Sequence, residues 1–407
     1  MAKKAKGDSV FAERTITNIM KAEFAGQMVV ADTKPHYKLL DGLRGVAALL
    51  VVWYHVHEGF SFAGGGMITG INHGYLAVDF FFMLSGFVIS YAYDDRWTKG
   101  FSLKDFFKRR IIRLHPMVII GAIIGVITFM LQGSVQWDGT HISTSAVMLA
   151  MLCAMFMIPA TPGCCYEVRG NGEMFPLNGP SWSLFFEYIG NILYTLIIRR
   201  LHKAALAWLV IVLGILHTSF AVLDVSGYGS IGVGWTIDTM NFFGGLLRML
   251  FPFTAGMLVA RNFRAINVRG AFWLCSAVLF ALFCVPYLPQ TFKVNDTLAL
   301  TLNGAFESFC IVIVFPILVW LGASGRASDG VSDKVCGFLG DISYPLYLIH
   351  YPFMYLFYSW LIKTEQYTLM ETWSVVLVLY ASCVLVAFIC LRLYDIPVRN
   401  WLRRRMG

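Results

Sequence analysis

Long apolar stretches recur along almost the whole chain and are separated by short polar segments. A membrane-spanning helix needs about twenty consecutive, mostly apolar residues. Ten stretches have this character, so we expect an all-α, polytopic bundle of ten transmembrane helices. The predicted helices lie at residues 39–58, 75–93, 116–132, 181–198, 204–221, 241–260, 270–288, 297–321, 338–361 and 373–393.

The composition agrees with a membrane protein. Hydrophobic residues make up 57% of the chain and charged residues 14%, whereas soluble domains are roughly 45–50% apolar and 25% charged. No polar segment between the apolar stretches is long enough for a second globular domain. We therefore expect one membrane domain at 39–393, preceded by a basic cytosolic segment at 1–38 and followed by a basic cytosolic tail at 394–407.

An eleventh apolar stretch, Ser145 to Ala160, is shorter and ends in IPATPGCC, where two prolines interrupt helical structure. Whether it crosses the membrane decides the orientation of all later helices. If it does not cross, thirteen later basic residues lie on the cytosolic side and three lie outside, as the positive-inside rule demands. We therefore expect a re-entrant or interfacial element here, with both termini cytosolic and the protein in the inner, or plasma, membrane.

Several ionisable residues fall within the predicted helices, where they are rare and usually face a cavity. At 1.5 Å per residue, His55 lies roughly 16 Å beyond Arg44 on one helix, in the outer half of the membrane. Asp79, Glu187 and His350 fall in the same central and outer layers. A histidine with carboxylates nearby can act as a general base on a hydroxyl, although each residue could instead only hold helices together.

Two further ionisable residues, Arg248 and Glu307, lie at similar depths on two other predicted helices. Opposite charges within the membrane commonly pair with each other. We expect these two residues to form a structural ion pair rather than to take part in catalysis.

The segment KDFFKRRIIRLHP between the second and third helices is strongly basic. Arg110 and Arg113 are three residues apart and so share one helical face. Guanidinium groups bind phosphate through a planar fork, which suits a ligand such as coenzyme A. Positive-inside anchoring is the alternative explanation for the same charges.

Five motifs together resemble a known family. In chain order they are LDGLRGVAALLVVWYHV (40–56), GYLAVDFFFMLSGFVIS (74–90), FFKRRIIRLHP (106–116), GPSWSLFFEY (179–188) and ISYPLYLIHYP (342–352). In their order and spacing they are similar to the integral membrane acyltransferases of family three, the bacterial polysaccharide O-acyltransferases. The resemblance extends from Tyr37 to the C-terminus.

The resemblance implies a function and a set of site residues. It places the family's arginine–histidine pattern on Arg44 and His55, which makes His55 catalytic, and its R-x-x-R pattern on Arg110 and Arg113, which then serve the acyl-CoA donor. We expect an O-acetyltransferase that moves an acetyl group from cytosolic acetyl-CoA to a carbohydrate hydroxyl outside. We expect no tightly bound cofactor, no metal and no nucleic-acid partner. The complete set of predicted site residues is His55, Asp79 and Glu187 for catalysis, Arg44, Arg110 and Arg113 for the donor, and Trp182 and His350 for the acceptor.

A carrier or flippase for a sugar or a lipid-linked sugar is the rival interpretation, because buried polar groups can also bind a substrate without chemistry. The arginine pair favours the acyltransferase, since a sugar carrier needs no site for coenzyme A. Some members of the resembled family carry an additional extracytoplasmic domain. We expect the membrane part alone to complete the transfer, or to hand the acyl group to a separate partner.

Overall fold

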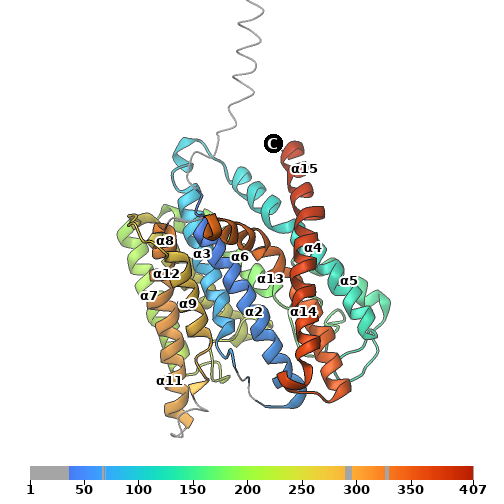
Figure 1. Cartoon of the computed structure of the whole chain (residues 1–407). Coiled ribbons are helices and arrows are strands. Elements are labelled where there is room, and N and C mark those ends of the chain that lie inside the picture. Colours follow the sequence, from blue (N-terminus) through green and yellow to red (C-terminus); the bar gives the residue numbers. More distant parts are fainter. Residues whose placement is uncertain (1–35, 67, 69, 289–295, 326–329, 407) are drawn as a thin grey trace, which may run out of the picture. The chain divides into compact units, whose positions relative to one another are not determined.

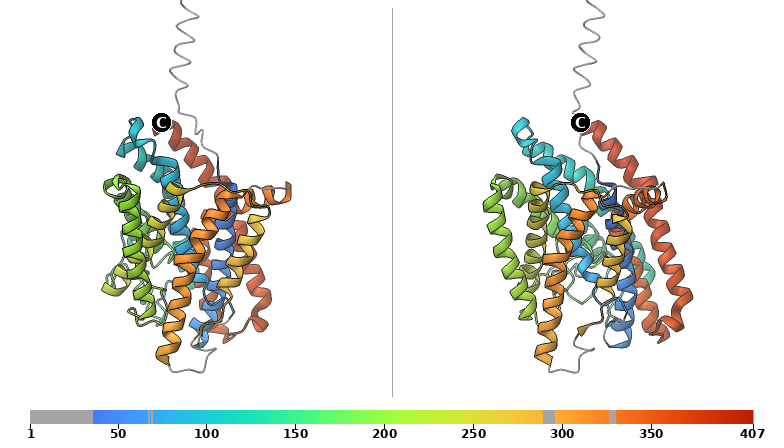
Figure 2. Two further views of the ribbon diagram at one scale, coloured as in Figure 1. Left: turned by 90° about the vertical axis from the view of Figure 1, so that its left-hand side faces the viewer. Right: turned by 60° about the vertical axis from the view of Figure 1, so that its left-hand side comes forward.

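The computed structural model describes residues 36–406, except 67, 69, 289–295 and 326–329. The predicted basic segment at 1–38 therefore falls almost entirely outside the described residues. From Tyr37 onward the chain forms one structural unit, in which the helices run side by side (Figures 1 and 2). We describe this unit alone.

The described residues form helices and no β-strand, which confirms the predicted all-α membrane bundle (Figure 1). Each of the ten predicted spans coincides with a helix or with a helix continued through a π-turn. Eight helical segments of the described chain are long and apolar enough to cross a membrane; of the two other predicted spans, one is the short α9 and the other the more polar α13. The helices are α2 (Lys38–Gly64), α3 (Ala77–Tyr93), α4 (Leu103–Gln132), α5 (Thr144–Met155), α6 (Ser181–Leu196), α7 (Lys203–Val222), α8 (Thr239–Asn262), α9 (Ala271–Phe283), α11 (Asp296–Phe309), α12 (Phe315–Ser324), α13 (Gly330–Thr364), α14 (Leu369–Ile389) and α15 (Ile396–Met406).

The eleventh apolar stretch forms the short helix α5, which begins after the N-cap Ser143. Its 12 residues give a length of about 18 Å, whereas the apolar core of a bilayer is about 30 Å thick. The helix packs against α4. Its length fits the expected element that does not cross the bilayer.

The connections between helices gather at two ends of the bundle. At one end, Arg261 in the last turn of α8 donates hydrogen bonds to the Asp94 carboxylate after α3 (2.7 Å) and to the Leu201 carbonyl before α7 (2.6 Å). We call this the basic end; α15 also ends there (Figure 1). At the opposite end, which we call the loop end, the His73 amide before α3 donates to the carbonyl of Phe283, the last residue of α9.

Two pairs of helices approach each other closely because glycines lie between them. A Cβ atom on Gly86 of α3 would lie 1.9 Å from the Phe253 carbonyl oxygen of α8, and one on Gly256 of α8 would lie 2.0 Å from the Met83 carbonyl oxygen of α3. Helices α2 and α13 form the most extensive helix pair. A Cβ atom on Gly45 of α2 would lie 2.3 Å from the Leu339 carbonyl oxygen of α13, so these helices also approach closely at a glycine. Small residues permit such close packing inside membranes, and these two helix pairs carry most of the site described next.

Candidate active site

A cavity of about 380 Å³ lies between the helices in the loop-end half of the bundle. Helices α2, α3, α6, α8 and α13 form its wall together with the segments at 137, 171–180 and 230–235. The wall contains His55 and Trp182, two of the residues predicted from the sequence. The remaining predicted residues are distributed between this cavity's surroundings and the basic end.

His55 has a carboxylate partner on its own helix. The Nδ1 atom of His55 lies 2.7 Å from Oε2 of Glu58, three residues later on α2. With Nδ1–H donating to this carboxylate, Nε2 of the neutral ring remains an acceptor and can take a proton from a substrate. Both side chains are partly exposed and line the cavity, so the pair has the geometry of a general base with an orienting carboxylate.

The Glu58 carboxylate is held by helix α13. It lies 3.2 Å from the Tyr351 hydroxyl and 2.9 Å from the Tyr358 hydroxyl. Helix α13 also brings His350 to the site, where its ring stacks on that of His55 with centroids 5.3 Å apart. His350 is fully buried, and its Nδ1 donates to the Leu346 carbonyl.

Glu58 was not among the residues predicted from the sequence. It falls at the very end of the apolar stretch, where a carboxylate is ordinarily taken for an interfacial charge. The signal that identifies it is the three-residue spacing from His55, which places the two side chains on one helical face.

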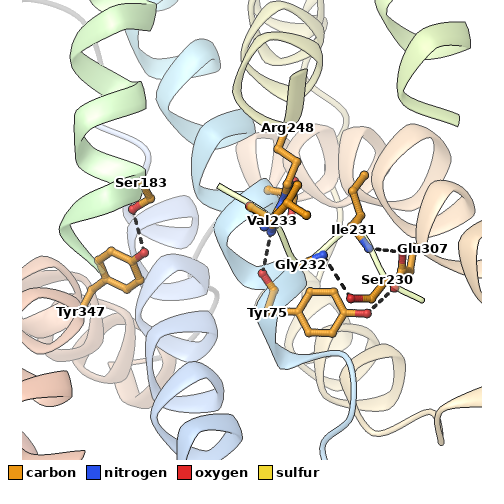
Figure 3. Close-up of polar contacts among 10 residues, drawn as sticks. Tyr75, Ser183, Ser230, Ile231, Gly232, Val233, Arg248, Glu307 and Tyr347 are labelled. Atoms are coloured by element: carbon orange, nitrogen blue, oxygen red, sulfur yellow. Dashed lines mark hydrogen bonds and ion pairs between the residues drawn. The ribbon is translucent and has the colours of Figure 1, made fainter. Parts of the chain in front are cut away.

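Asp79 does not contact His55 in the structure, although both lie near the cavity. Its carboxylate accepts two hydrogen bonds from Arg248, one from Nε at 3.1 Å and one from Nη2 at 2.6 Å, and both side chains are buried. Arg248 also donates to the Val233 carbonyl and to the Tyr75 carbonyl (Figure 3). The Asp79–Arg248 pair therefore fixes the loop after α7 against the start of α3.

The predicted ion pair between Arg248 and Glu307 does not form. The prediction is wrong because Arg248 pairs with Asp79 instead. The Glu307 carboxylate instead accepts hydrogen bonds from the Ile231 amide (2.9 Å) and the Tyr75 hydroxyl (Figure 3). Spacing along separate helices gives depth but not the rotation of each helix, so it cannot choose between two carboxylates at similar depths.

Trp182, predicted as a stacking surface for a sugar, does line the cavity. The Arg248 guanidinium lies 5.2 Å from the centre of its ring. Gly234 packs against another part of this ring, since a Cβ atom there would lie 2.6 Å from Cζ3 of Trp182. Only part of the indole is thus available to a ligand.

The predicted donor-site arginines lie toward the basic end and differ in environment. Arg110 is buried, and its Nη2 donates to Glu187 (2.5 Å), which also accepts from the Ser85 hydroxyl (2.7 Å). Glu187 is therefore engaged with Arg110 rather than with His55. Arg113 is exposed and has no hydrogen bond or ion pair within the described part of the chain.

Arg44 completes this basic cluster, which we define as Arg44, Arg110 and Arg113. Arg44 donates to the Ser343 hydroxyl of α13 (2.9 Å) and to Asp41 (2.7 Å). Arg113 is close enough to the other two arginines to interact with them electrostatically. Arg110 is paired with Glu187 and keeps one buried nitrogen, Nε, without a hydrogen-bond partner. Arg113 differs in that its side chain is exposed and its whole guanidinium is without a hydrogen bond among the described residues.

Comparison with known proteins agrees with the resemblance seen in the motifs. The sequence profile of the acyltransferase domain family matches residues 37–392. No solved structure shows a significant match. Among curated proteins, Protein 2 in picA locus of Rhizobium radiobacter is 34% identical over 163 residues, which is 38% of this chain and 79% of that protein.

Two longer matches carry functional names. Peptidoglycan O-acetyltransferase OatA of Listeria monocytogenes is 27% identical over 377 residues, 89% of this chain but 55% of the relative, so the chain spans about half of that protein. Acyltransferase MdmB of Streptomyces mycarofaciens is 25% identical over 334 residues, 77% of each chain. Together with the helix bundle, these matches show that the chain belongs to the acyltransferase family and is a multi-pass membrane O-acyltransferase, with O-acetyltransferases among its relatives.

Proposed function

We propose that the protein transfers an acetyl group from cytosolic acetyl-CoA to a carbohydrate hydroxyl on the other side of the membrane, with His55 as the general base. The His55–Glu58 pair on the cavity wall is the observation that carries this proposal. A free imidazole nitrogen, backed by a carboxylate and facing a cavity, is the group that deprotonation of a hydroxyl requires.

The reaction then follows from the geometry of the pair. Nε2 of His55 removes the proton from the acceptor hydroxyl while the oxygen attacks the thioester carbonyl, and a tetrahedral intermediate forms. The carbon–sulfur bond breaks, the acetyl ester remains on the acceptor, and the leaving thiolate takes the proton from the His55 imidazolium. Glu58 stabilises that imidazolium and holds the ring in the tautomer whose Nε2 accepts.

The donor enters at the basic end in this proposal. The positive-inside rule assigns this end to the cytosol, and the free guanidinium of Arg113 suits a phosphate of coenzyme A. Arg44 and His55 are roughly 16 Å apart along α2, a separation that an extended acyl-pantetheine arm can span. The thioester can thus reach His55 while the nucleotide stays with the arginines.

Carbohydrate is the proposed acceptor class because the cavity wall combines aromatic rings with polar side chains, as sugar-binding sites do. The name of the Listeria relative, a peptidoglycan O-acetyltransferase, describes an acceptor of the same class. A sugar carrier needs the cavity but neither the His55–Glu58 pair nor Arg113.

Purified protein in nanodiscs tests the proposal directly. With acetyl-CoA supplied, we expect release of free coenzyme A and acetylation of an added glycan, detected by mass spectrometry. The His55→Gln protein, checked for an unchanged melting temperature, should do neither. Sugar uptake into vesicles without any consumption of acetyl-CoA would favour the carrier instead.

A further inference from the structure

A second carboxylate, that of Glu173, lies on the cavity wall. Glu173 belongs to the loop between α5 and α6 and is buried. Its carboxylate accepts hydrogen bonds from the Asn171 side-chain amide (2.8 Å) and from the Tyr355 hydroxyl. Both carboxylates on the wall, Glu58 and Glu173, lie close enough to Tyr351 to interact with it electrostatically. The ligand in this cavity therefore meets two acidic side chains.

The positive charges nearby are either paired or lie outside the cavity wall. Apart from His55, Arg248 is the cationic side chain among the described residues of the cavity wall. Arg248 uses its donors on Asp79 and on two backbone carbonyls. Arg169 lies against the ring of Tyr355, 3.4 Å from its centre, and donates to the Pro176 carbonyl and the Gln132 side chain. Its Nη2 has no hydrogen-bond partner, but the side chain is buried and is not part of the cavity wall. An anionic group in the cavity would thus face carboxylates without a free cation to pair with.

The same part of the wall suits an uncharged, hydroxyl-rich ring. Trp137, Trp182 and Trp235 all line the cavity, and aromatic faces stack well on the apolar face of a sugar. Near Glu173, the Trp137 indole N–H and the Asn171 side-chain oxygen are buried without hydrogen-bond partners. Sugar hydroxyls can both donate and accept, so they can satisfy both kinds of group.

We propose that Glu173 is a specificity-determining residue and that the acceptor is a sugar ring with neither a carboxylate nor a phosphate beside the hydroxyl that is acylated. The inference rests on the proposed function, because it takes this cavity as the acceptor site. Glu173 selects through repulsion: an anion placed beside a poorly hydrated carboxylate is disfavoured, while a neutral hydroxyl donates a hydrogen bond to it.

Two matched ligands test this selectivity without any catalytic step. Methyl glucoside and methyl glucuronide differ in one group, a hydroxymethyl in the first and a carboxylate in the second. Their binding to the full chain in nanodiscs is measured by saturation-transfer NMR at pH 8, with no acyl donor present. We expect glucuronide to bind at least about ten-fold more weakly than glucoside, the size of effect that a modest like-charge repulsion produces.

Variants assign the effect to Glu173. Glu173→Gln should reduce the difference between the two ligands to about three-fold or less, and Glu173→Asp, which keeps the charge, should retain most of it. Glu365→Gln, an exposed site at the end of α13, serves as the control and should bind like the unchanged protein.

Three results would overturn the inference: equal binding of both ligands to the unchanged protein, an unaltered ratio in folded Glu173→Gln, or no binding of either ligand. The failure of the proposed function is a separate result. It would appear as intact discrimination between the ligands together with no consumption of acetyl-CoA.

Discussion

Oε2 of Glu58 lies 2.7 Å from Nδ1 of His55, one helical turn away on α2. Residues three apart on a helix are neighbours whatever the tertiary packing, so α2 alone brings base and carboxylate together. Helix α13 then fixes the carboxylate through Tyr351 and Tyr358. The arrangement needs no carboxylate from another helix.

Replacing His55 with glutamine should lower acetyl transfer by roughly 10²- to 10⁴-fold, the contribution of a positioned general base. Glutamine keeps a polar side chain of similar reach, so the melting temperature should change little. Transfer and melting are measured on the same preparation. Near-normal transfer by a stable protein would remove His55 from the mechanism and make His350 the next histidine to examine.

Glu58→Gln should also impair transfer, by roughly 10²- to 10⁴-fold, because an amide N–H facing Nδ1 stabilises the tautomer that lacks a free Nε2. The substitution preserves size, so binding of a glycoside should be largely retained while kcat falls. Steady-state kinetics separate an effect on kcat from an effect on KM for the acceptor. A change confined to KM would show that Glu58 binds substrate and does not orient His55.

The two arginines of the R-x-x-R motif should respond differently to alanine. Arg113→Ala removes a free guanidinium and should raise KM for acetyl-CoA by about ten-fold or more, with partial recovery in Arg113→Lys because lysine lacks the fork. Arg110→Ala leaves Glu187 without its partner, and should cost about 3–5 kcal/mol of stability, as for other buried pairs. Kinetics and thermal melting distinguish the two effects; equal loss of stability in both variants would argue against a donor role for Arg113.

The close packing of α3 on α8 can be tested by comparing two glycine-to-alanine variants, one at the contact and one at an uncrowded control position. Gly86→Ala places a Cβ 1.9 Å from a backbone oxygen, so the helices must separate, at a cost of about 1–3 kcal/mol. Gly337→Ala on α13 meets no atom within 4 Å and should be neutral or stabilising. Melting of both variants in one detergent gives the comparison, and equal stability would contradict the packing described.

Selectivity against anionic ligands should depend on pH. Burial raises the pKa of Glu173 to about 7, while glucuronide stays ionised throughout the neutral range. Repulsion should therefore be weak at pH 6, where Glu173 is largely neutral, and stronger at pH 8, where it is charged. The groups around this carboxyl are Tyr351 and Tyr355 on α13 and Glu167, Arg169 and Asn171 in its own loop.

The binding ratio of glucoside to glucuronide, followed from pH 6 to pH 8, checks this prediction. Glu173→Gln should give a ratio that does not change with pH. A ratio that rises equally in both proteins would assign the titration to another group.

The sequence predicted the helices well because a bilayer leaves few alternatives. Backbone groups in hydrocarbon must be satisfied within the chain, so twenty apolar residues almost dictate a helix, and all ten predicted spans coincide with helices. The agreement is weaker at α9 and α13, which are not among the eight helical segments of the described chain that are long and apolar enough to cross a membrane. Helix α9 has 13 residues, and α13 is more polar than those eight segments.

Partners of charged residues could not be predicted in the same way. Helical rise gives depth, but pairing depends on helix rotation and on loops, as the Arg248–Asp79 pair shows. Glu173 could not be found from the apolar pattern at all, because it reaches the cavity on a loop. Glu58 could have been found, since its relation to His55 is local.

The distance between His55 and the basic cluster decides what has to cross the membrane in the proposed reaction. The acetyl group moves outward and leaves the electrons of the carbon–sulfur bond on sulfur, while the proton of the acceptor hydroxyl leaves toward the cytosol on the thiol of coenzyme A. The acceptor and coenzyme A therefore each keep their charge, and a turnover moves no net charge across the bilayer. A membrane potential acts only on charge that is moved through it, so an energised membrane should neither drive nor oppose acetylation.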